Sequence, residues 1–356
     1  MNVAVFLPNW VGDVVMATPT LRALSKRLGN DGRLIGVMRP YVSQVLAGTT
    51  WLDEQLFYNP QADDPDLGGR ALVDALRVRD LDAVVLLSNS LRTGWLAWRS
   101  GAKRRIGFDR YLRGPLLTDR LTHTWQGRTW YGARRFTPAP VLDDYLRLAE
   151  AFGCAPESRR LELALTGDDR AAAVRAWREL KLPEGRNVVT FNTGGAFGAA
   201  KVWPVEHFAE LARRIVTTTD ASVLVICGPA ERAAACEIVA RAAHPRVVSL
   251  ADQPLSIGLS KACVARSRLM VTTDSGPRHF AAAFDVPVVS LFGPTHIAWS
   301  ENHFERATHL QLKLPCGPCQ KRVCPLGTHA CMRDLGPDRV YSIVMQMLHN
   351  DAARAA

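Results

Sequence analysis

Apolar runs of strand length alternate with amphipathic helical patterns in both halves of this chain, and this alternation limits the fold more than any other feature. In the first half the apolar runs span residues 3–7, 34–37, 83–87 and 105–108, with helical patterns between them. Strands that alternate with helices are typical of βαβ units, which build a parallel sheet covered by helices. The first half is therefore predicted to be a Rossmann-like α/β domain.

The second half repeats the alternation more regularly. Its apolar runs span residues 188–192, 222–227, 247–250, 269–272 and 286–292, and its helical patterns span 205–217, 231–242, 257–265 and 277–284. We place the boundary after residue 165, which gives Rossmann-like domains at 1–165 and 166–335. The last amphipathic stretch, 336–356, is predicted to form a helix that packs back on the first domain.

Two α/β domains of similar size are expected to bind a ligand in a cleft between the carboxyl ends of their sheets. Neither half carries the pattern G-x-G-x-x-G after a strand, so dinucleotide redox chemistry has no direct support. No apolar run approaches the ~20 residues that cross a bilayer. The opening apolar run is too short for a signal peptide and lacks a basic region before it and a small-residue cleavage site after it. The sequence therefore predicts a cytoplasmic protein.

The balance of charge is strongly positive, with 44 Lys and Arg against 34 Asp and Glu and a formal charge of +10. This excess favours anionic partners, such as nucleic acid, a phosphate-bearing substrate or an acidic membrane surface. A coding bias toward Arg is the alternative explanation, so charge alone identifies no partner.

The first motif is PNWVGD at residues 8–13, in the turn that follows the first apolar run. A strand-to-helix turn of this kind is expected to point side chains such as Asn9 and Trp10 toward the cleft. Asp13 then lies near the start of a helix, where its carboxylate has two interpretations. It caps free backbone N–H groups, or it acts as a general base on an acceptor hydroxyl. Sequence position does not separate the two.

A second motif, NTGGAFGAAK at residues 192–201, follows the first strand of the second domain. Small residues such as Gly194 and Gly195 let backbone amides approach a ligand closely, and Lys201 adds a cation. This composition is typical of a diphosphate-binding loop. The sequence is not a Walker motif, however, and a single glycine-rich loop is a weak signal.

A third motif, TTDSGPRH at residues 272–279, links a strand to the next helix. Asp274 and Ser275 are good N-cap residues, and the free N–H groups of a first helical turn form an anion site. His279 is better explained by a core or helix-face position than by catalysis. The turn LFGPT at residues 291–295 leaves the last strand beside the same cleft. The glycine-rich loop and the TTDSGPRH turn are therefore two predicted phosphate-binding loops in one domain.

Four cysteines crowd into the segment 316–331. They are Cys316, Cys319, Cys324 and Cys331. Four thiols at this spacing suit a tetrahedral structural metal site, with zinc the first choice and an iron–sulfur cluster an alternative. Reduced thiols, or disulfides formed on isolation, are the other interpretation. No His-x-x-Glu pattern lies nearby, so a catalytic metal is not indicated.

Taken together, these motifs resemble one protein family. The order of PNWVGD, the glycine-rich loop with K-x-W-P, TDSGPRH and FGPT is similar to that of the ADP-heptose:lipopolysaccharide heptosyltransferases. The cysteine-rich segment is similar to the heptosyltransferase II branch. The resemblance runs nearly from end to end, and it is specific because the motifs occur jointly and in the family's order.

The resemblance implies a GT-B fold, in which two Rossmann-like domains face each other across a central cleft. It implies an inverting transfer of heptose from ADP-L-glycero-D-manno-heptose to the inner core of lipopolysaccharide, with a heptosyl-Kdo-lipid A acceptor and no cofactor for catalysis. Asp13 matches the family's catalytic base, and Lys201 matches the lysine that faces the donor diphosphate. The other donor-binding positions are Thr193, Gly194, Gly195, Glu231 (ribose), Asp274 (heptose), Ser275, Gly276 and His279.

The acceptor that the resemblance implies is phosphorylated and belongs to a membrane lipid. Peripheral contact with the cytoplasmic membrane surface is therefore expected. The candidate acceptor-binding residues are Asn9, Trp10, Arg92, Arg104 and Arg105. A merely solvated basic face is the alternative for each arginine. His296 stands where an acidic residue is expected in many relatives.

Two alternatives stay open. Another transferase of the same family, of the heptosyltransferase I or III type or with a different nucleotide-sugar, would carry the same motifs. A zinc-dependent nucleic-acid-binding protein would use the four-cysteine segment and the positive charge, but it leaves two α/β domains unexplained and its basic residues lack interleaved aromatics. No nucleic-acid partner is therefore expected.

Overall fold

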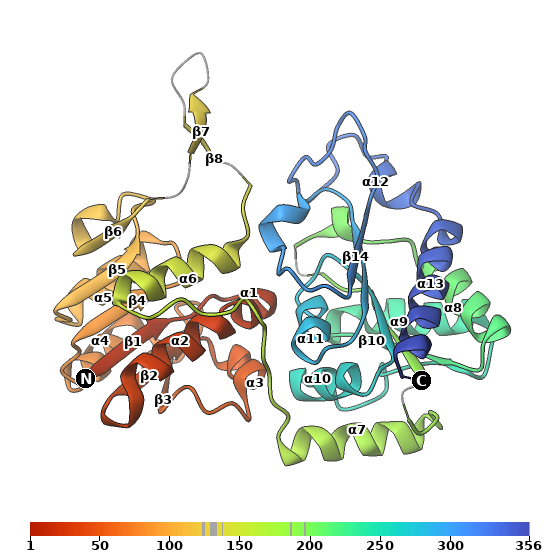
Figure 1. The fold of residues 1–356 in the computed structure, drawn as a ribbon, viewed down its shortest axis with the longest axis horizontal. Coiled ribbons are helices and arrows are strands. Elements are labelled where there is room, and N and C mark those ends of the chain that lie inside the picture. The colour runs from red at the N-terminus through yellow and green to blue at the C-terminus, as the bar shows by residue number, and fades with distance from the viewer. Residues whose placement is uncertain (123–124, 129–133, 137, 186, 196, 356) are drawn as a thin grey trace. The chain divides into compact units, whose positions relative to one another are not determined.

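Each half of the chain folds around a parallel sheet whose central strands are buried on both faces (Figure 1). The computed structural model describes residues 1–355 apart from 123–124, 129–133, 137, 186 and 196. The chain divides into a first unit, Met1–Ala164 with Ala298–Asn302, and a second unit, Leu165–Ile297 with His303–Ala356. The division falls one residue before the boundary predicted from the sequence.

In the first unit, the described residues form a parallel six-stranded sheet in the order β3-β2-β1-β4-β5-β6. Its strands are β1 (Asn2–Phe6), β2 (Arg33–Met38), β3 (Glu54–Phe57), β4 (Ala83–Leu86), β5 (Arg104–Phe108) and β6 (Asp119–Leu121). The helices are α1 (Val11–Met16), α2 (Thr18–Leu28), α3 (Ser43–Leu46), α4 (Gly69–Arg77), α5 (Leu91–Arg99) and α6 (Val141–Phe152). A separate antiparallel pair, β7 (Trp125–Arg128) and β8 (Arg134–Phe136), interrupts the pattern between β6 and α6.

In the second unit, the part of the chain that the structure describes forms another parallel six-stranded sheet, in the order β11-β10-β9-β12-β13-β14. Its strands are β9 (Val188–Asn192), β10 (Ser222–Ile226), β11 (Val247–Ser249), β12 (Leu269–Thr273), β13 (Val288–Phe292) and β14 (Ala307–Gln311). The helices are α7 (Gly167–Glu179), α8 (Val205–Thr218), α9 (Arg232–Ala242), α10 (Ile257–Ala265), α11 (Arg278–Ala283), α12 (Ala330–Arg333) and α13 (Pro337–Ala355).

The two sheets share one strand order, and this order determines where a ligand can bind. The direction of winding reverses between β1 and β4 in the first unit and between β9 and β12 in the second. In open parallel sheets, ligands bind at the carboxyl ends of the strands beside such a reversal point. Every residue of β9, β10, β12 and β13 is buried, as expected where helices cover both faces. The predicted pair of Rossmann-like α/β units is confirmed.

The C-terminal helix α13 packs on the second unit, and its packing on the first unit stays a prediction. Its residues Val340, Val344 and Leu348 lie in the hydrophobic core of the second unit. The backbone oxygen of Leu348 accepts a hydrogen bond from Arg268 at 2.9 Å. The spacing of four residues places the three apolar side chains on one stripe, and that stripe covers α8 and the sheet. Periodicity predicted the helix but not the surface that it covers.

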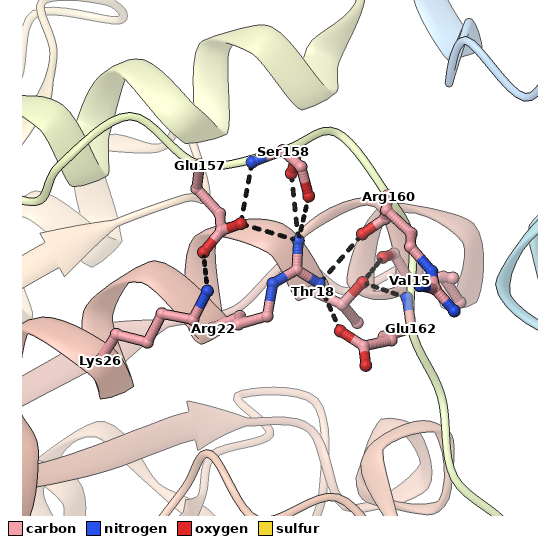
Figure 2. A network of polar contacts seen from close by, with 8 residues as sticks. All are labelled: Val15, Thr18, Arg22, Lys26, Glu157, Ser158, Arg160 and Glu162. Atoms are coloured by element: carbon pink, nitrogen blue, oxygen red, sulfur yellow. Dashed lines mark hydrogen bonds and ion pairs between the residues drawn. The ribbon is translucent and has the colours of Figure 1, made fainter.

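The segment that leaves the first unit is fixed to α2 by a network of polar contacts (Figure 2). The Arg22 guanidinium lies 3.3 Å from the carboxylate of Glu157 and 2.5 Å from that of Glu162. It also donates to two backbone oxygens of the same segment, and Lys26 pairs with Glu157 at 2.6 Å. This network holds residues 157–162 on the helix that follows α1.

No helix among the described residues is long and apolar enough to cross a bilayer.

Candidate active site

The loops after β9 and β12 meet at the reversal point of the second sheet. Asn192, the last residue of β9, donates from its side-chain amide to the Thr272 hydroxyl at 3.0 Å and to the Ser275 hydroxyl at 2.7 Å. The Thr273 hydroxyl donates to the backbone oxygen of Gly194 at 3.1 Å. These bonds cross from one strand end to the other. They hold the glycine-rich loop and the TTDSGPRH turn side by side, as the sequence predicts.

Lys201 extends from the glycine-rich loop to Asp274 in the neighbouring turn. Its ammonium lies 2.5 Å from carboxylate oxygen Oδ2 and 3.0 Å from the backbone oxygen of Asp274. The same Oδ2 accepts a hydrogen bond from the Thr295 hydroxyl at 2.6 Å, and Arg278 Nη1 lies 3.7 Å from Oδ1. All four side chains are buried. The loops after β9, β12 and β13 therefore converge on one carboxylate.

The charge of Asp274 is maintained by its neighbours. Burial on its own would raise the pKa of this carboxyl group. The charges of Lys201 and Arg278, together with hydrogen bonds from Lys201 and Thr295, outweigh burial and lower the pKa below its ordinary value of 3.8. The three charged side chains together carry a net positive charge, which is complementary to a phosphate group at this edge of the sheet.

Thr193 places a buried hydroxyl in the glycine-rich loop, and this hydroxyl has no hydrogen-bond partner within the described residues. A buried polar group without a partner is costly, so the site favours a ligand that bonds to it. In the turn that follows β10, the Glu231 carboxylate accepts a hydrogen bond from the Gly228 amide at 2.9 Å. A Cβ atom on Gly194 would lie 2.8 Å from that carboxylate. Only glycine allows Glu231 to pack so closely on the loop.

The turn between β12 and α11 contains Ser275 and Gly276. The amide of Arg278 donates to the Ser275 backbone oxygen at 3.3 Å, and the amide of His279 donates to Gly276 at 3.1 Å. Pro277 has no N–H group. The predicted phosphate cradle at 275–278 is therefore reduced to the amides of Ser275 and Gly276. His279 is buried inside the second unit, which favours a packing role over a contact with the donor.

The four-cysteine segment packs against two loops of the site, those that follow β9 and β13. The backbone oxygen of Arg322 accepts from the Ala200 amide at 3.1 Å, next to Lys201 in the glycine-rich loop. The Gln320 amide donates to the backbone oxygen of Pro294 at 2.7 Å, in the turn that carries Thr295. The segment is therefore a scaffold for the site.

A metal site is not supported at this segment. Across the part of the chain that the structure describes, no group of three or more His, Cys, Asp or Glu side chains is arranged to hold a metal ion. None of the four cysteines forms a disulfide. The thiols still influence one another, because burial first, and then the nearby Cys319, Cys324 and Cys316, raise the pKa of Cys331. The predicted zinc or iron–sulfur cluster at Cys316, Cys319, Cys324 and Cys331 therefore does not fit the observed arrangement.

One aromatic ring links the segment to Lys201. The Phe197 ring centroid lies 4.5 Å from the Lys201 ammonium and 5.6 Å from the Arg322 guanidinium carbon. Both distances are within the range of cation–π interactions. Ala196, the neighbouring residue of the glycine-rich loop, lies outside the described residues.

The first unit carries its predicted residues directly after β1. Asn9 and Trp10 are exposed, and Trp10 is the N-cap residue of α1 without a side-chain cap bond. Asp13 lies in the first turn of α1 and is partly exposed. Its carboxylate is close to the buried Tyr145 of α6. Burial, and then the charges of Asp13 and Asp144, raise the pKa of Tyr145 well above its ordinary value of 10.0.

The structure separates the three arginines that are expected to bind an acceptor. Arg92 is the second residue of α5, exposed at the carboxyl edge of the first sheet. Arg104 and Arg105 begin β5 and lie at the opposite, amino edge. Arg104 pairs with Asp119 at 2.8 Å, and Arg105 donates to backbone oxygens of its own unit. These two side chains stabilise the sheet, so the acceptor role expected of them is not retained.

Two contributors to the site were missed by sequence reasoning. Thr295 was seen only as part of a turn, although β13 lies beside β12 and its end is therefore close to Asp274. Strand adjacency would have indicated this contact. The contact of Arg322 with Ala200 depends on the path of a long loop, and the sequence carries no signal for it.

Comparison with known proteins decides the family. The family model described as glycosyltransferase family 9 (heptosyltransferase) matches residues 69–330. The chain belongs to glycosyltransferase family 9. Lipooligosaccharide heptosyltransferase 2 of Campylobacter jejuni is 30% identical over 354 residues, which are 98% of this chain and 99% of the relative. Lipopolysaccharide heptosyltransferase 2 of Escherichia coli is 25% identical over 372 residues, covering 99% of this chain and 100% of the relative.

Among solved structures, this family 9 chain is similar to the ADP-heptose lps heptosyltransferase II of E. coli. The TM-score is 0.77 at 22% sequence identity, and the match covers 99% of this chain and 100% of the other. The GT-B fold class and the family that the motifs resemble are therefore confirmed, and the chain is a glycosyltransferase. The alternative of a zinc-dependent nucleic-acid-binding protein is set aside, because the family model matches residues 69–330 and no metal-holding group is found among the described residues.

Proposed function

We propose that this family 9 glycosyltransferase transfers heptose from ADP-L-glycero-D-manno-heptose to the inner core of lipopolysaccharide, with heptosyl-Kdo-lipid A as acceptor. The observation that carries the proposal is the buried Lys201–Asp274 pair, together with the buried Thr193 hydroxyl, which has no hydrogen-bond partner within the described residues and lies on the same glycine-rich loop as Lys201. Relatives named as heptosyltransferase 2 match over nearly the whole chain, which supports the same donor and the same step.

The donor diphosphate would bind where the loops after β9 and β12 meet. The 275–276 turn is held at the end of β9 by the bond from Asn192 to the Ser275 hydroxyl. Lys201 supplies a cation, and the Thr193 hydroxyl gains the hydrogen-bond acceptor that it otherwise lacks within the described residues. Charge-assisted hydrogen bonds of this kind are stronger than neutral ones. The carboxylate of Glu231, which packs on Gly194, would accept hydrogen bonds from the ribose hydroxyls.

The reaction would be a single displacement that inverts the anomeric carbon. A bond forms between the acceptor oxygen and the anomeric carbon while the bond from that carbon to the ADP oxygen breaks. Asp13 would accept the proton of the acceptor hydroxyl as general base. Negative charge grows on the departing diphosphate, and the preorganised Lys201 would stabilise it. Because the protein supplies this cation, we propose that transfer requires no divalent metal.

The proposed acceptor is a lipid, which has a consequence for where the enzyme works. We propose a cytoplasmic enzyme that makes peripheral contact with the inner membrane surface while it reaches the sugar. The formal charge of +10 supports contact with an anionic surface.

The proposed step is tested by product analysis on two acceptors. The purified chain is incubated with ADP-heptose and either Kdo-lipid A or heptosyl-Kdo-lipid A. The masses of the products are then measured by mass spectrometry. We expect one heptose to be added to the heptosylated acceptor only. Addition to the heptose-free acceptor alone would indicate an enzyme of the heptosyltransferase I type, and addition to an acceptor that already carries two heptoses would indicate the III type.

A further inference from the structure

Helix α5 carries apolar residues on two opposite faces. Leu96 and Ala97 lie in the core of the first unit. On the other side, Leu91, Trp95 and Trp98 are 50%, 44% and 49% exposed. Spacings of four and three residues place these three side chains in one stripe along the helix. One leucine and two tryptophans therefore face solvent in a row.

The neighbouring loop adds two more exposed apolar side chains. Tyr111 and Leu112 have positive φ angles of 53° and 60°, a left-handed conformation that is costly for residues with a side chain. Leu112 is 87% exposed. The loop is fixed by buried Arg113, which donates to the Phe108 backbone oxygen at 2.8 Å and to the Asn89 side chain at 2.7 Å. A strained backbone with buried anchors therefore holds Leu112 in solvent.

A groove of about 930 Å³ lies between α5 and this loop, within the first unit. Its lining is largely apolar and includes Tyr58, Pro60, Trp95, Leu112 and Leu116, with Arg92 as a charged member. Leu91 and Trp95 of the exposed stripe and Leu112 of the loop therefore line one groove.

Two arginine side chains lie over aromatic rings of this region. The Arg99 guanidinium lies 5.5 Å from the Trp95 ring centroid, and that of Arg110 lies 4.8 Å from the Tyr111 centroid. Tryptophan and tyrosine are enriched where protein meets the headgroup level of a bilayer, and arginine is attracted to anionic lipid. The exposed aromatic rings, the exposed Leu112 side chain and the arginines together are complementary to a lipid surface with negative charge.

We propose that Leu91, Trp98, Leu112 and the arginines Arg92, Arg99 and Arg110 form a docking surface for a bilayer that contains anionic phospholipid. The apolar side chains enter the headgroup region, and the guanidinium groups meet lipid phosphates. The proposal deepens the proposed function, because an enzyme with a lipid acceptor gains from being held at the membrane. Binding itself requires neither donor nor acceptor, so it is tested separately from transfer.

The test uses the full chain and sucrose-loaded vesicles that are pelleted by centrifugation. One set contains phosphatidylethanolamine and phosphatidylglycerol, and the other contains phosphatidylcholine alone. The test variant is the double substitution Trp98→Ser with Arg99→Glu on α5. The matched control is Val174→Ser with Arg175→Glu, a second exposed pair of adjacent residues, on α7 of the second unit. Melting temperature and ADP binding confirm that each variant is folded.

We expect the wild type and the α7 control to bind the anionic vesicles, with weaker binding at high salt. The α5 variant is expected to have a partition coefficient lower by about tenfold or more, since it loses apolar area and reverses a charge. Equal binding of both variants, or wild-type binding that does not distinguish the two lipids, would overturn the proposal. The proposal would also be overturned if the wild type does not bind vesicles and forms a dimer that the α5 substitutions dissociate. That result would show that the surface is an interface between copies of the chain.

Discussion

The ammonium of Lys201 lies 2.5 Å from the carboxylate of Asp274, although 73 residues separate the two in sequence. The strand order of the second sheet brings them together, because β9 and β12 are neighbours at the reversal point. Two further loops support the pair, through Thr295 from the end of β13 and Arg322 from the four-cysteine segment. Residues from two further loops thus help to hold the Lys201–Asp274 pair at this edge of the sheet.

Substitution of Lys201 tests the electrostatic part of this site. In Lys201→Met the buried Asp274 carboxylate loses its nearest cation, so we expect the free energy of unfolding to fall by about 3 kcal/mol. ADP affinity should fall at least about tenfold, since a charged hydrogen bond to phosphate is lost. Calorimetric titration with ADP and urea unfolding measure the two effects. Lys313→Met, an exposed lysine of the same unit, is the control that should change neither.

The Thr193 hydroxyl should matter for the donor and not for the fold. Thr193→Val removes a buried hydroxyl that has no partner among the described residues, so stability without ligand should be unchanged or higher. ADP affinity should fall by about tenfold. Thr190→Val, within β9, removes a hydroxyl that is bonded to Ser267. That control should lose stability and keep ADP affinity. The opposite pattern in the two variants would show that Thr193 does not contact the donor.

The network around Arg22 should make the first unit sensitive to acid (Figure 2). Burial would raise the pKa of Glu157, but hydrogen bonds from Lys26, the Ser158 amide and Arg22 outweigh it and lower the pKa to about 2. A lowered pKa stabilises the fold above the ordinary value of 4.5, and this stabilisation is lost as the pH falls toward 2. We expect Glu157→Gln to reduce the free energy of unfolding at pH 7 by about 1–3 kcal/mol.

The same variant gives a pH signature that urea unfolding can resolve. The stability difference between wild type and Glu157→Gln should shrink as the pH is lowered from 4.5 toward 2. Glu237→Gln, in the exposed pair with Arg241 on α9, should cost less than about 1 kcal/mol at any pH. A difference for Glu157→Gln that does not depend on pH would mean that its charge does not stabilise the fold.

Gly198 tests the scaffold role of the four-cysteine segment. A Cβ atom on this residue would lie 2.6 Å from the Arg322 backbone oxygen, and its φ of +144° is unfavourable for other residues. Gly198→Ala should push the segment off the glycine-rich loop and weaken ADP binding severalfold. Gly153→Ala, with a φ of +109° and no atom within 4 Å, carries only the backbone cost. It should lower stability by about 1 kcal/mol and leave ADP binding intact.

The central strands of the two sheets and the two main loops of the site could be predicted from the sequence, but edge strands such as β3 could not. Strands such as β9 and β12 are buried on both faces, so they read as continuous apolar runs. β3 alternates between half-buried and exposed residues, and no strand was predicted there. Because parallel strands end at one edge of a sheet, the closeness of Lys201 and Asp274 followed from their positions after strands.

Features that depend on three-dimensional packing did not follow from the sequence. The stripe formed by Val340, Val344 and Leu348 predicts a helix but does not say which core it covers. The positive charge of Arg104 suggested an acceptor contact, but the ion pair with Asp119 at the amino edge of the sheet is set by strand register. The spacing of four cysteines suggested a metal, but spacing along a loop does not determine whether the thiols meet at one point, and no metal-holding group is found among the described residues.

The most direct test of the proposed transfer reaction is the activity of Asp13→Asn, measured together with its ADP binding. The variant keeps the size of the side chain and removes its basicity. If Asp13 is the general base, ADP should bind as to wild type while heptose transfer falls by about 10²–10⁴-fold. Transfer at the wild-type rate would show that Asp13 only stabilises the start of α1, and would contradict its proposed role as the base that activates the acceptor.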